Sequence, residues 1–186
     1  MKKLIALTVL LALVMTAFAG CGDGDGDGSG KSGKAGSSTP EEALESYINV
    51  YWGYDEPSKA EAKALLPTEI WSIEDAPTPD EYHDIVLQNR EDTVPKITDA
   101  SGKNYTYSII INSQEDTDQE QLEEMREEYD DNGLKGQKLT EYCYVSLRVA
   151  FGNSSGSDGF GVDGYAYVYQ YNGKWYVEYC YLPLGF

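Results

Sequence analysis

The last third of the chain alternates between apolar side chains and tyrosine or polar side chains. Between residues 141 and 151 every second position is apolar, and two further segments, 160–171 and 174–181, continue the pattern. A period of two residues predicts β-strands that bury one face. Asn172-Gly173, which separates the last two segments, is typical of a two-residue hairpin turn. The pattern therefore predicts a three-stranded antiparallel meander.

This hairpin turn also predicts the register of the strands. Counting outward from Asn172-Gly173 predicts three cross-strand pairs: Tyr171–Lys174, Tyr169–Tyr176 and Tyr165–Cys180. If Phe151 pairs with Phe160, two more follow: Arg148–Asp163 and Tyr142–Tyr169.

The alternation gives the sheet two different faces. The apolar face is expected to form the core beneath the helices, and on the last strand it would include Trp175, Val177, Tyr179 and Tyr181. Glu178 falls on the other face, where we expect it to be solvated. That face also carries seven tyrosines, which we predict as an interaction surface: Tyr142, Tyr144, Tyr165, Tyr167, Tyr169, Tyr171 and Tyr176.

Two cysteines lie in these strands, and the register predicts that they stay unpaired. Cys143 falls on the apolar face and Cys180 on the tyrosine face, with a whole strand between them. Two strand spacings are about 9.5 Å, beyond the roughly 7 Å that a disulfide can span between Cα atoms. We therefore predict two free thiols, against the usual expectation for an exported domain.

Helix start signals precede the strands. Thr39-Pro40-Glu41-Glu42 is a capping box that opens a helix ending near Gly53. Ser58 with Glu61 predicts a short helix through residue 66, and Thr78 opens a third helix. Three helices are thus expected before any clear strand.

A strand and an acidic helix complete the pattern. Residues 105–112 are rich in β-formers, and Thr117 caps a helix that stops at Asn132-Gly133. Its narrow apolar stripe consists of Leu122, Met125 and Tyr129. The whole predicts an α+β domain, in which N-terminal helices pack on a bent, mostly antiparallel four-stranded sheet and one helix lies between the first and second strands.

The N-terminus has the layout of a secretory signal. Lys2 and Lys3 precede an apolar run over residues 4–15, which is too short for a transmembrane helix. Phe18-Ala19-Gly20-Cys21 resembles the bacterial lipobox, which implies lipid attachment at Cys21 and a location on the extracytoplasmic face of the cell membrane. Ala17-Phe18-Ala19 would also serve as an ordinary cleavage site, releasing a soluble protein.

These signals divide the chain into three parts. We expect a signal peptide over residues 1–20, a lipidated cysteine with a flexible tether over 21–38 and an α+β domain over 39–186. The tether matches half of a calcium-binding loop from Asp23 and all but one residue of a phosphate-binding loop from Gly28. Lys34 and Ala35 stand where ligands would be required, so we predict no cofactor and no metal.

The net charge of the chain restricts its partners. The sequence has 14 basic and 32 acidic residues, and loss of Lys2 and Lys3 with the signal would leave 12 against 32, a net charge near −20. Nucleic acids and anionic lipid surfaces would be repelled, so the membrane is expected as a partner only through the lipid anchor. Partners with a cationic or neutral surface are compatible with this charge.

The order of elements resembles uncharacterised bacterial lipoproteins with a nuclear transport factor 2-like, cystatin-type fold. Thr39-Pro40-Glu41-Glu42 at the start of the domain and Gly173-Lys174-Trp175-Tyr176 in the last hairpin are part of this resemblance. It implies a bent sheet around a long helix and a conical pocket, which some members use for catalysis and many only for binding or dimerisation. Fold alone does not define function.

Catalytic residues of the kind that this resemblance implies are hard to find. Related isomerases and cyclases place Asp, His or Tyr inside the cone, yet the core face has no carboxylate in mid-strand. Tyr179 and Tyr181 could donate into a pocket, but core tyrosines with satisfied hydroxyls are the simpler interpretation. His83, the only histidine, has no second histidine or cysteine at ligand spacing, so we expect a solvated acidic helix face there.

Two interpretations of the seven tyrosines remain open. Tyrosine offers rigid contact area with a polar tip, which suits a homodimer or an envelope protein partner, with a glycan or a small apolar ligand as other candidates. The tyrosines could equally reflect β-propensity on a partly solvent-exposed sheet face, with the acidic helix folded over that face. Our leading hypothesis is an envelope-tethered binding or protein-interaction module, and the alternative is a small-molecule isomerase or cyclase that uses the cone pocket.

Overall fold

The computed structural model describes residues 35–116, 119–153 and 159–184. The predicted signal peptide, Cys21 and nearly all of the predicted tether lie outside these ranges. The described elements, with η for 3₁₀-helices, are α2 (Pro40–Trp52), α3 (Lys59–Ala64), η1 (Thr68–Ser72), α4 (Pro79–Ser101), β1 (Tyr105–Asp116), α5 (Gln119–Asp131), η2 (Gly136–Lys138), β2 (Leu139–Asn153), β3 (Gly159–Tyr171) and β4 (Lys174–Tyr181).

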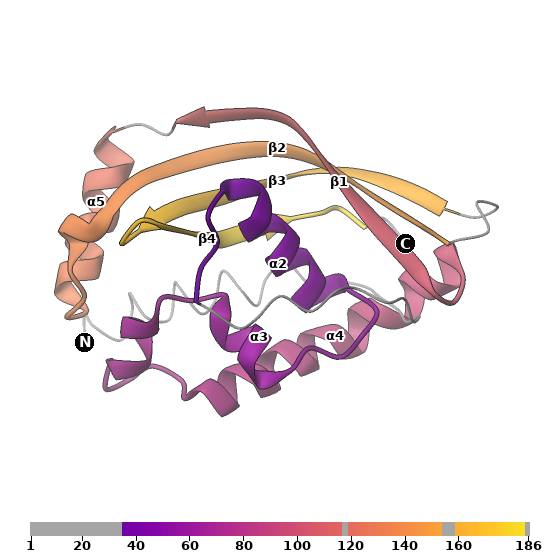
Figure 1. Ribbon diagram of the computed structural model, residues 1–186, viewed down its shortest axis with the longest axis horizontal. Coiled ribbons are helices and arrows are strands. Elements are labelled where there is room, and N and C mark those ends of the chain that lie inside the picture. Colours follow the sequence, from indigo (N-terminus) through magenta and orange to yellow (C-terminus); the bar gives the residue numbers. More distant parts are fainter. Residues whose placement is uncertain (1–34, 117–118, 154–158, 185–186) are drawn as a thin grey trace.

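The domain is an α+β structure built on one open sheet. Four antiparallel strands follow one another in the order β1-β2-β3-β4, and α5 separates β1 from β2 along the chain. Figure 1 shows a curved sheet with α2, α3 and α4 beneath it and α5 at one end. Helix α2 contacts β3 and β4, whereas α4 contacts β2 and β3. The predicted fold class is therefore confirmed at the level of α+β with an antiparallel four-stranded sheet.

Three predicted helix starts are confirmed by their caps, whereas the fourth predicted cap, Thr117, lies outside the described residues. Thr39 accepts a hydrogen bond from the backbone N–H of Glu42, and Pro40 occupies the first turn of α2. Ser58 with Glu61, and Thr78 with Glu81, form complete capping boxes at α3 and α4. The first two helices also end close to their predicted ends.

The predicted alternation produces the core. Apolar side chains of β2, β3 and β4 pack against α2 and α4, and the largest fully buried ones include Leu147, Val149 and Phe151. Most of the predicted register is confirmed, with these observed pairs: Tyr171–Lys174, Tyr169–Tyr176, Phe151–Phe160, Arg148–Asp163 and Tyr142–Tyr169.

One part of the predicted register, on β4, is wrong. The pairing shifts between Tyr167 and Val168, so that Glu178 is an extra residue on the β4 side. Beyond this β-bulge every side chain of β4 changes face. Cys180 pairs with Ala166 instead of Tyr165 and is fully buried in the core. The bulge also moves two predicted core residues to the opposite face: Tyr179 and Tyr181.

Cys143 and Cys180 are both free, as predicted, although one premise of that prediction failed. Both thiols lie in the core, and β3 separates their strands. Burial and the nearby carboxylate of Asp116 raise the pKa of the Cys143 thiol to about 11. The intervening strand, which a bulge does not remove, is what keeps the two thiols apart.

The folded part begins earlier than predicted. Residues 35–38 were assigned to the flexible tether, but Ser37 forms two backbone hydrogen bonds with Trp175, each 3.0 Å. Gly36, with φ of 70°, lies against the ring of Tyr176 and donates its N–H to the carbonyl of Ala64. The small residues of this segment are typical of a linker. Here they allow its backbone to approach Trp175 and Tyr176 closely.

Four polar side chains of α4 are buried, and two of them, His83 and Arg90, bond to the segment around the end of α2. His83 was expected on a solvated face, but it is only 8% exposed, and its Nε2 lies 2.8 Å from the carbonyl oxygen of Pro57. Arg90 donates hydrogen bonds to the carbonyls of Val50, Gly53 and Asp55, each 2.8 Å long. Both residues join α4 to the segment that follows α2, so they have structural roles.

Candidate binding surface

The outer face of the sheet, opposite α2 and α4, divides the seven predicted tyrosines into two groups. Three of them are buried where α5 packs against the sheet: Tyr169, Tyr171 and Tyr176. The apolar stripe of α5 covers them with Leu122, Met125 and Tyr129. At this end of the sheet the tyrosines are structural, as the second interpretation expected.

The other tyrosines remain partly exposed. With the two residues that the β-bulge adds, they form the open tyrosine surface: Tyr142, Tyr144, Tyr165, Tyr167, Tyr179 and Tyr181. Tyr181 is 37% exposed, and the other five are intermediate. Sequence reasoning missed Tyr179 and Tyr181 because a bulge leaves no strong signal. The one available sign was apolar Cys180 at a position that strict alternation assigned to the tyrosine face.

The rings of this surface form a continuous array. Tyr142 stacks on Tyr167 with 5.6 Å between ring centroids, and Tyr144 stacks on Tyr165 at 5.7 Å. Tyr165 also lies 5.5 Å from the ring of Tyr181. Each stacked ring covers one face of its cross-strand neighbour, so the array presents ring edges and hydroxyl groups to a partner. This arrangement suits a hydrogen-bonding protein contact better than it suits a flat platform for a sugar ring.

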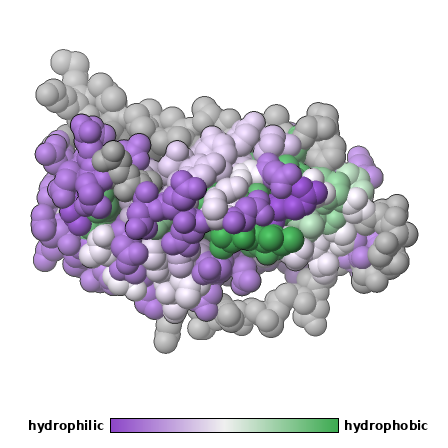
Figure 2. All heavy atoms as spheres, turned by 90° about the horizontal axis from the view of Figure 1, so that it is seen from above, coloured by the Kyte–Doolittle hydropathy of each residue, from purple (hydrophilic) through white to green (hydrophobic). Residues whose placement is uncertain are grey.

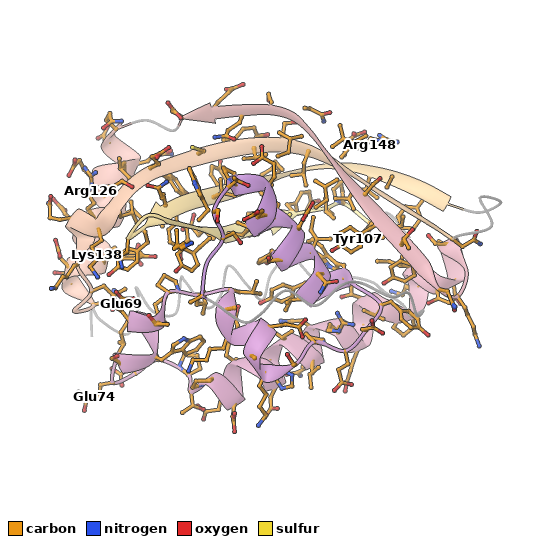
Figure 3. The ribbon with its side chains drawn as sticks, in the orientation of Figure 1. Glu69, Glu74, Tyr107, Arg126, Lys138 and Arg148 are labelled. Carbon is orange, nitrogen blue, oxygen red and sulfur yellow. The ribbon has the colours of Figure 1, made fainter. Side chains whose placement is uncertain are left out.

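Residues of different character border the tyrosine array. Figure 2, which looks down on the sheet side of the molecule, shows pale surface between the hydrophilic surface over α5 on the left and a hydrophobic patch near the centre. Ile110 of β1, 53% exposed, is the most exposed large hydrophobic residue described. Arg148 and Asp163 form an ion pair of 2.6 Å on the outer face. Figure 3 shows Arg148 pointing away from the helices.

Glu178 lies at the border between the open and the buried tyrosines. It was expected to be solvated, but it is partly buried and accepts a hydrogen bond of 2.5 Å from the hydroxyl of Tyr142. Burial raises the pKa of the Glu178 carboxyl, and the nearby carboxylate of Glu128 raises it further. Burial also raises the pKa of Glu128 itself, which lies on α5. Burial thus disfavours the charged form of both carboxyl groups, Glu178 on β4 and Glu128 on α5.

A separate acidic pocket of about 250 Å³ lies between η1 and the end of α5. Its acidic lining consists of Glu69, Glu74, Asp75 and Asp131. Lys138 forms an ion pair of 2.8 Å with Glu69, and this hydrogen bond lowers the pKa of the Glu69 carboxyl. Figure 3 shows Lys138 close to Glu69, with Glu74 further away. The lining would repel anionic ligands.

Few of the polar groups described in the core could act as an acid or a base. The buried polar residues that the structure describes are His83, Arg90, Thr93 and Ser101, so no described carboxylate is fully buried. Within the same ranges, no group of three or more His, Cys, Asp or Glu side chains is arranged to hold a metal ion. None of the described helices is both long and apolar enough to cross a bilayer.

Comparison with models of protein families, with curated protein sequences and with solved structures finds no match.

Proposed function

We propose that this chain is an envelope-tethered interaction module that binds a protein partner through the open tyrosine surface. The observation that carries the proposal is the array of six partly exposed tyrosines on one sheet face, with two cross-strand stacked pairs. A solvent-exposed sheet face without a binding role would be expected to carry charged and small polar residues. Tyrosines held in place by their neighbours lose little conformational entropy on binding, which favours affinity.

The partner is a second copy of the chain or another envelope protein. Either partner would lie beside this domain, which in this proposal a lipid on Cys21 holds at the extracytoplasmic face of the cell membrane. A net charge of −18 for the full chain opposes contact with nucleic acid. It also weakens the case for self-association and favours a partner with a neutral or cationic surface.

The fold adds a finer proposal. A curved antiparallel sheet with helices on its inner side is compatible with a nuclear transport factor 2-like cone. Folds of this kind carry many unrelated functions, so the fold supports a binding role without specifying the ligand. The alternative, a small-molecule isomerase or cyclase, would need an acid or base in that cone, and the buried polar residues described include no carboxylate.

A capture experiment from the native envelope tests the proposal. The triple variant Tyr144→Ser, Tyr165→Ser, Tyr167→Ser removes the centre of the array and should reduce capture at least tenfold. Ser146→Arg is a second variant, because Ser146 pairs with Tyr165 on the outer face and a long side chain there would block access without deleting a ring. Lys63→Ser, on the exposed face of α3, is the control.

The outcome must separate binding from folding. Circular dichroism and the unfolding midpoint should show that Ser146→Arg keeps the fold, and this variant should still lose capture. If the wild type captures nothing and stays monomeric at high concentration, the array is only structural. Equal capture by the wild type and Ser146→Arg would contradict the proposal in the same way.

A further inference from the structure

The two edges of the sheet differ in how far the chain covers them. At the β4 edge, Ser37 pairs with Trp175 through two main-chain hydrogen bonds of 3.0 Å, so the chain covers part of that edge itself. At the opposite edge, β1 pairs with β2 along its length, and no other described element packs extensively against it. Figure 1 shows β1 along one side of the curved sheet. An uncovered edge strand can pair with a strand of another chain.

The pairing of Ser37 with Trp175 also shows which main-chain groups of β1 face outward. Trp175 uses its N–H and C=O on the outer side of β4. Because the direction of these groups alternates from residue to residue, the observed register carries the alternation across all four strands. It places the main-chain groups of Tyr107, Ile109 and Ile111 on the outer side of β1. Among the described residues, no strand pairs with them there.

The outer strand lacks the features that normally protect an edge. Natural edge strands are short, carry charged residues or proline, or are twisted away by a bulge. Residues 105–114 contain neither a charged residue nor a proline, and the bulge of β1 comes only after Ile111. Ile110, on the outer face in the middle of this stretch, is 53% exposed. A regular, uncharged strand segment with an exposed isoleucine is therefore accessible for pairing.

We infer that two copies of this chain pair antiparallel through β1, in a dimer with one continuous sheet. This inference goes beyond the proposed function, because it uses the edge of the sheet and not the open tyrosine surface. Ile109, the middle one of the outward-facing residues, lies on the two-fold axis, so that Tyr107 of each copy faces Ile111 of the other. Three outward-facing residues per copy give about six main-chain hydrogen bonds. The two Ile110 side chains become diagonal neighbours on the outer face, within reach of each other.

The charges at the ends of β1 favour a second copy over an unrelated extended segment. Pairing about Ile109 places Lys103 of each copy close to Glu115 of the other, and both residues are exposed. The acidic end of one strand thus meets a cation, whereas parallel pairing would place like charges side by side. The net charge of −18 opposes self-association, but the charges lie outside residues 105–114, and salt screens them beyond about 8 Å.

Sedimentation equilibrium of the full chain over a range of concentrations tests the inference. One pair of edge strands makes a small interface, so we expect a dimer with a dissociation constant on the order of 10 µM. Ile110→Lys places two like charges beside each other and should raise this constant at least about tenfold, although it makes the chain less negative. Ala60→Lys, an exposed position on α3, adds the same charge and should leave the constant unchanged. Circular dichroism and the urea midpoint should show that both variants keep the fold.

A charge reversal tests the register without altering Ile110. Lys103→Glu or Glu115→Lys alone replaces two attractive pairs by two repulsive ones and should weaken the dimer about fivefold. The double variant should restore the wild-type dissociation constant. Within one chain the two residues lie at opposite ends of β1, so restoration requires contact between copies.

The outcomes separate the edge from the open tyrosine surface. A wild type that stays monomeric at about 1 mM, or equal dissociation constants for Ile110→Lys and Ala60→Lys, would overturn the inference. A double charge variant that is not restored would overturn pairing about Ile109. Loss of the dimer in the triple tyrosine variant but not in Ile110→Lys would assign self-association to the tyrosine surface instead. If the edge dimer fails while Ser146→Arg still abolishes envelope capture, the proposed function stands.

Discussion

Arg90 provides the sharpest prediction about what holds the helical layer together. The residue is 6% exposed, and its guanidinium group donates to the carbonyls of Val50, Gly53, Tyr54 and Asp55. These carbonyls lie at or just beyond the C-terminal turn of α2, where helix carbonyls lack partners within the helix. The positive charge also interacts favourably with the negative end of the α2 dipole.

Replacing Arg90 by methionine should remove these interactions while keeping most of the side-chain volume. Hydrogen bonds that involve a charged group contribute roughly 1.5 to 3 kcal/mol each. The bonds to Val50 and Gly53 are buried, whereas water can replace Arg90 at the other two carbonyls. Two buried bonds give about 3 to 6 kcal/mol, and the desolvation relieved by removing the charge lowers the expected loss to about 2 to 5 kcal/mol. That is a large share of the roughly 5 to 15 kcal/mol by which domains are stable.

Urea denaturation followed by circular dichroism measures this loss. With a slope near 2 kcal/mol per molar urea, the midpoint of Arg90→Met should fall by about 1 to 2.5 M. Arg90→Lys keeps the charge but not the planar fork, so it should lose roughly half as much. Arg148→Met is the control, because its exposed ion pair with Asp163 contributes less than about 1 kcal/mol. A loss below 1 kcal/mol in Arg90→Met would refute the reasoning.

Three other predictions concern the carboxylates and cysteines. Because burial raises the folded-state pKa of Glu178, wild-type stability from this group should fall as pH rises above the unfolded value of 4.5. Glu178→Gln should therefore be more stable than wild type at pH 7, and this advantage should vanish in urea titrations below pH 4.5. Cys143 and Cys180 should resist a thiol reagent in the native chain and both react after unreduced denaturation, whereas reaction of neither would contradict the strand order. Cys21→Ala should move the chain from the membrane fraction to the soluble one, and a wild-type mass without acyl groups would argue against the anchor.

Periodicity and turn chemistry predicted the sheet because they act locally. Alternation over residues 141–151 and the Asn172-Gly173 turn were enough to place Tyr142 opposite Tyr169 and Arg148 opposite Asp163. The capping boxes at Ser58 and Thr78 likewise depend on residues three apart in the chain. These features need no knowledge of tertiary contacts.

The failures come from tertiary contacts. The bulge at Glu178 reverses the faces of Tyr179, Cys180 and Tyr181, and nothing in the local pattern requires it. Similarly, the burial of Tyr169 follows from how α5 docks, which its apolar stripe allowed but did not specify. The candidate surface could therefore be assigned to the correct sheet face from sequence, but its boundary and the partial burial of Glu178 could not.

The most direct test of the account is whether the open tyrosine surface contacts a partner in the intact envelope. The measurement is photo-crosslinking in the native host with p-benzoylphenylalanine in place of Tyr167, compared with the same amino acid in place of exposed Lys63 on α3. The account predicts a discrete heavier adduct, a dimer or a complex with one envelope protein, from position 167 and none from position 63. The same products from both positions, or no adduct from position 167, would contradict it.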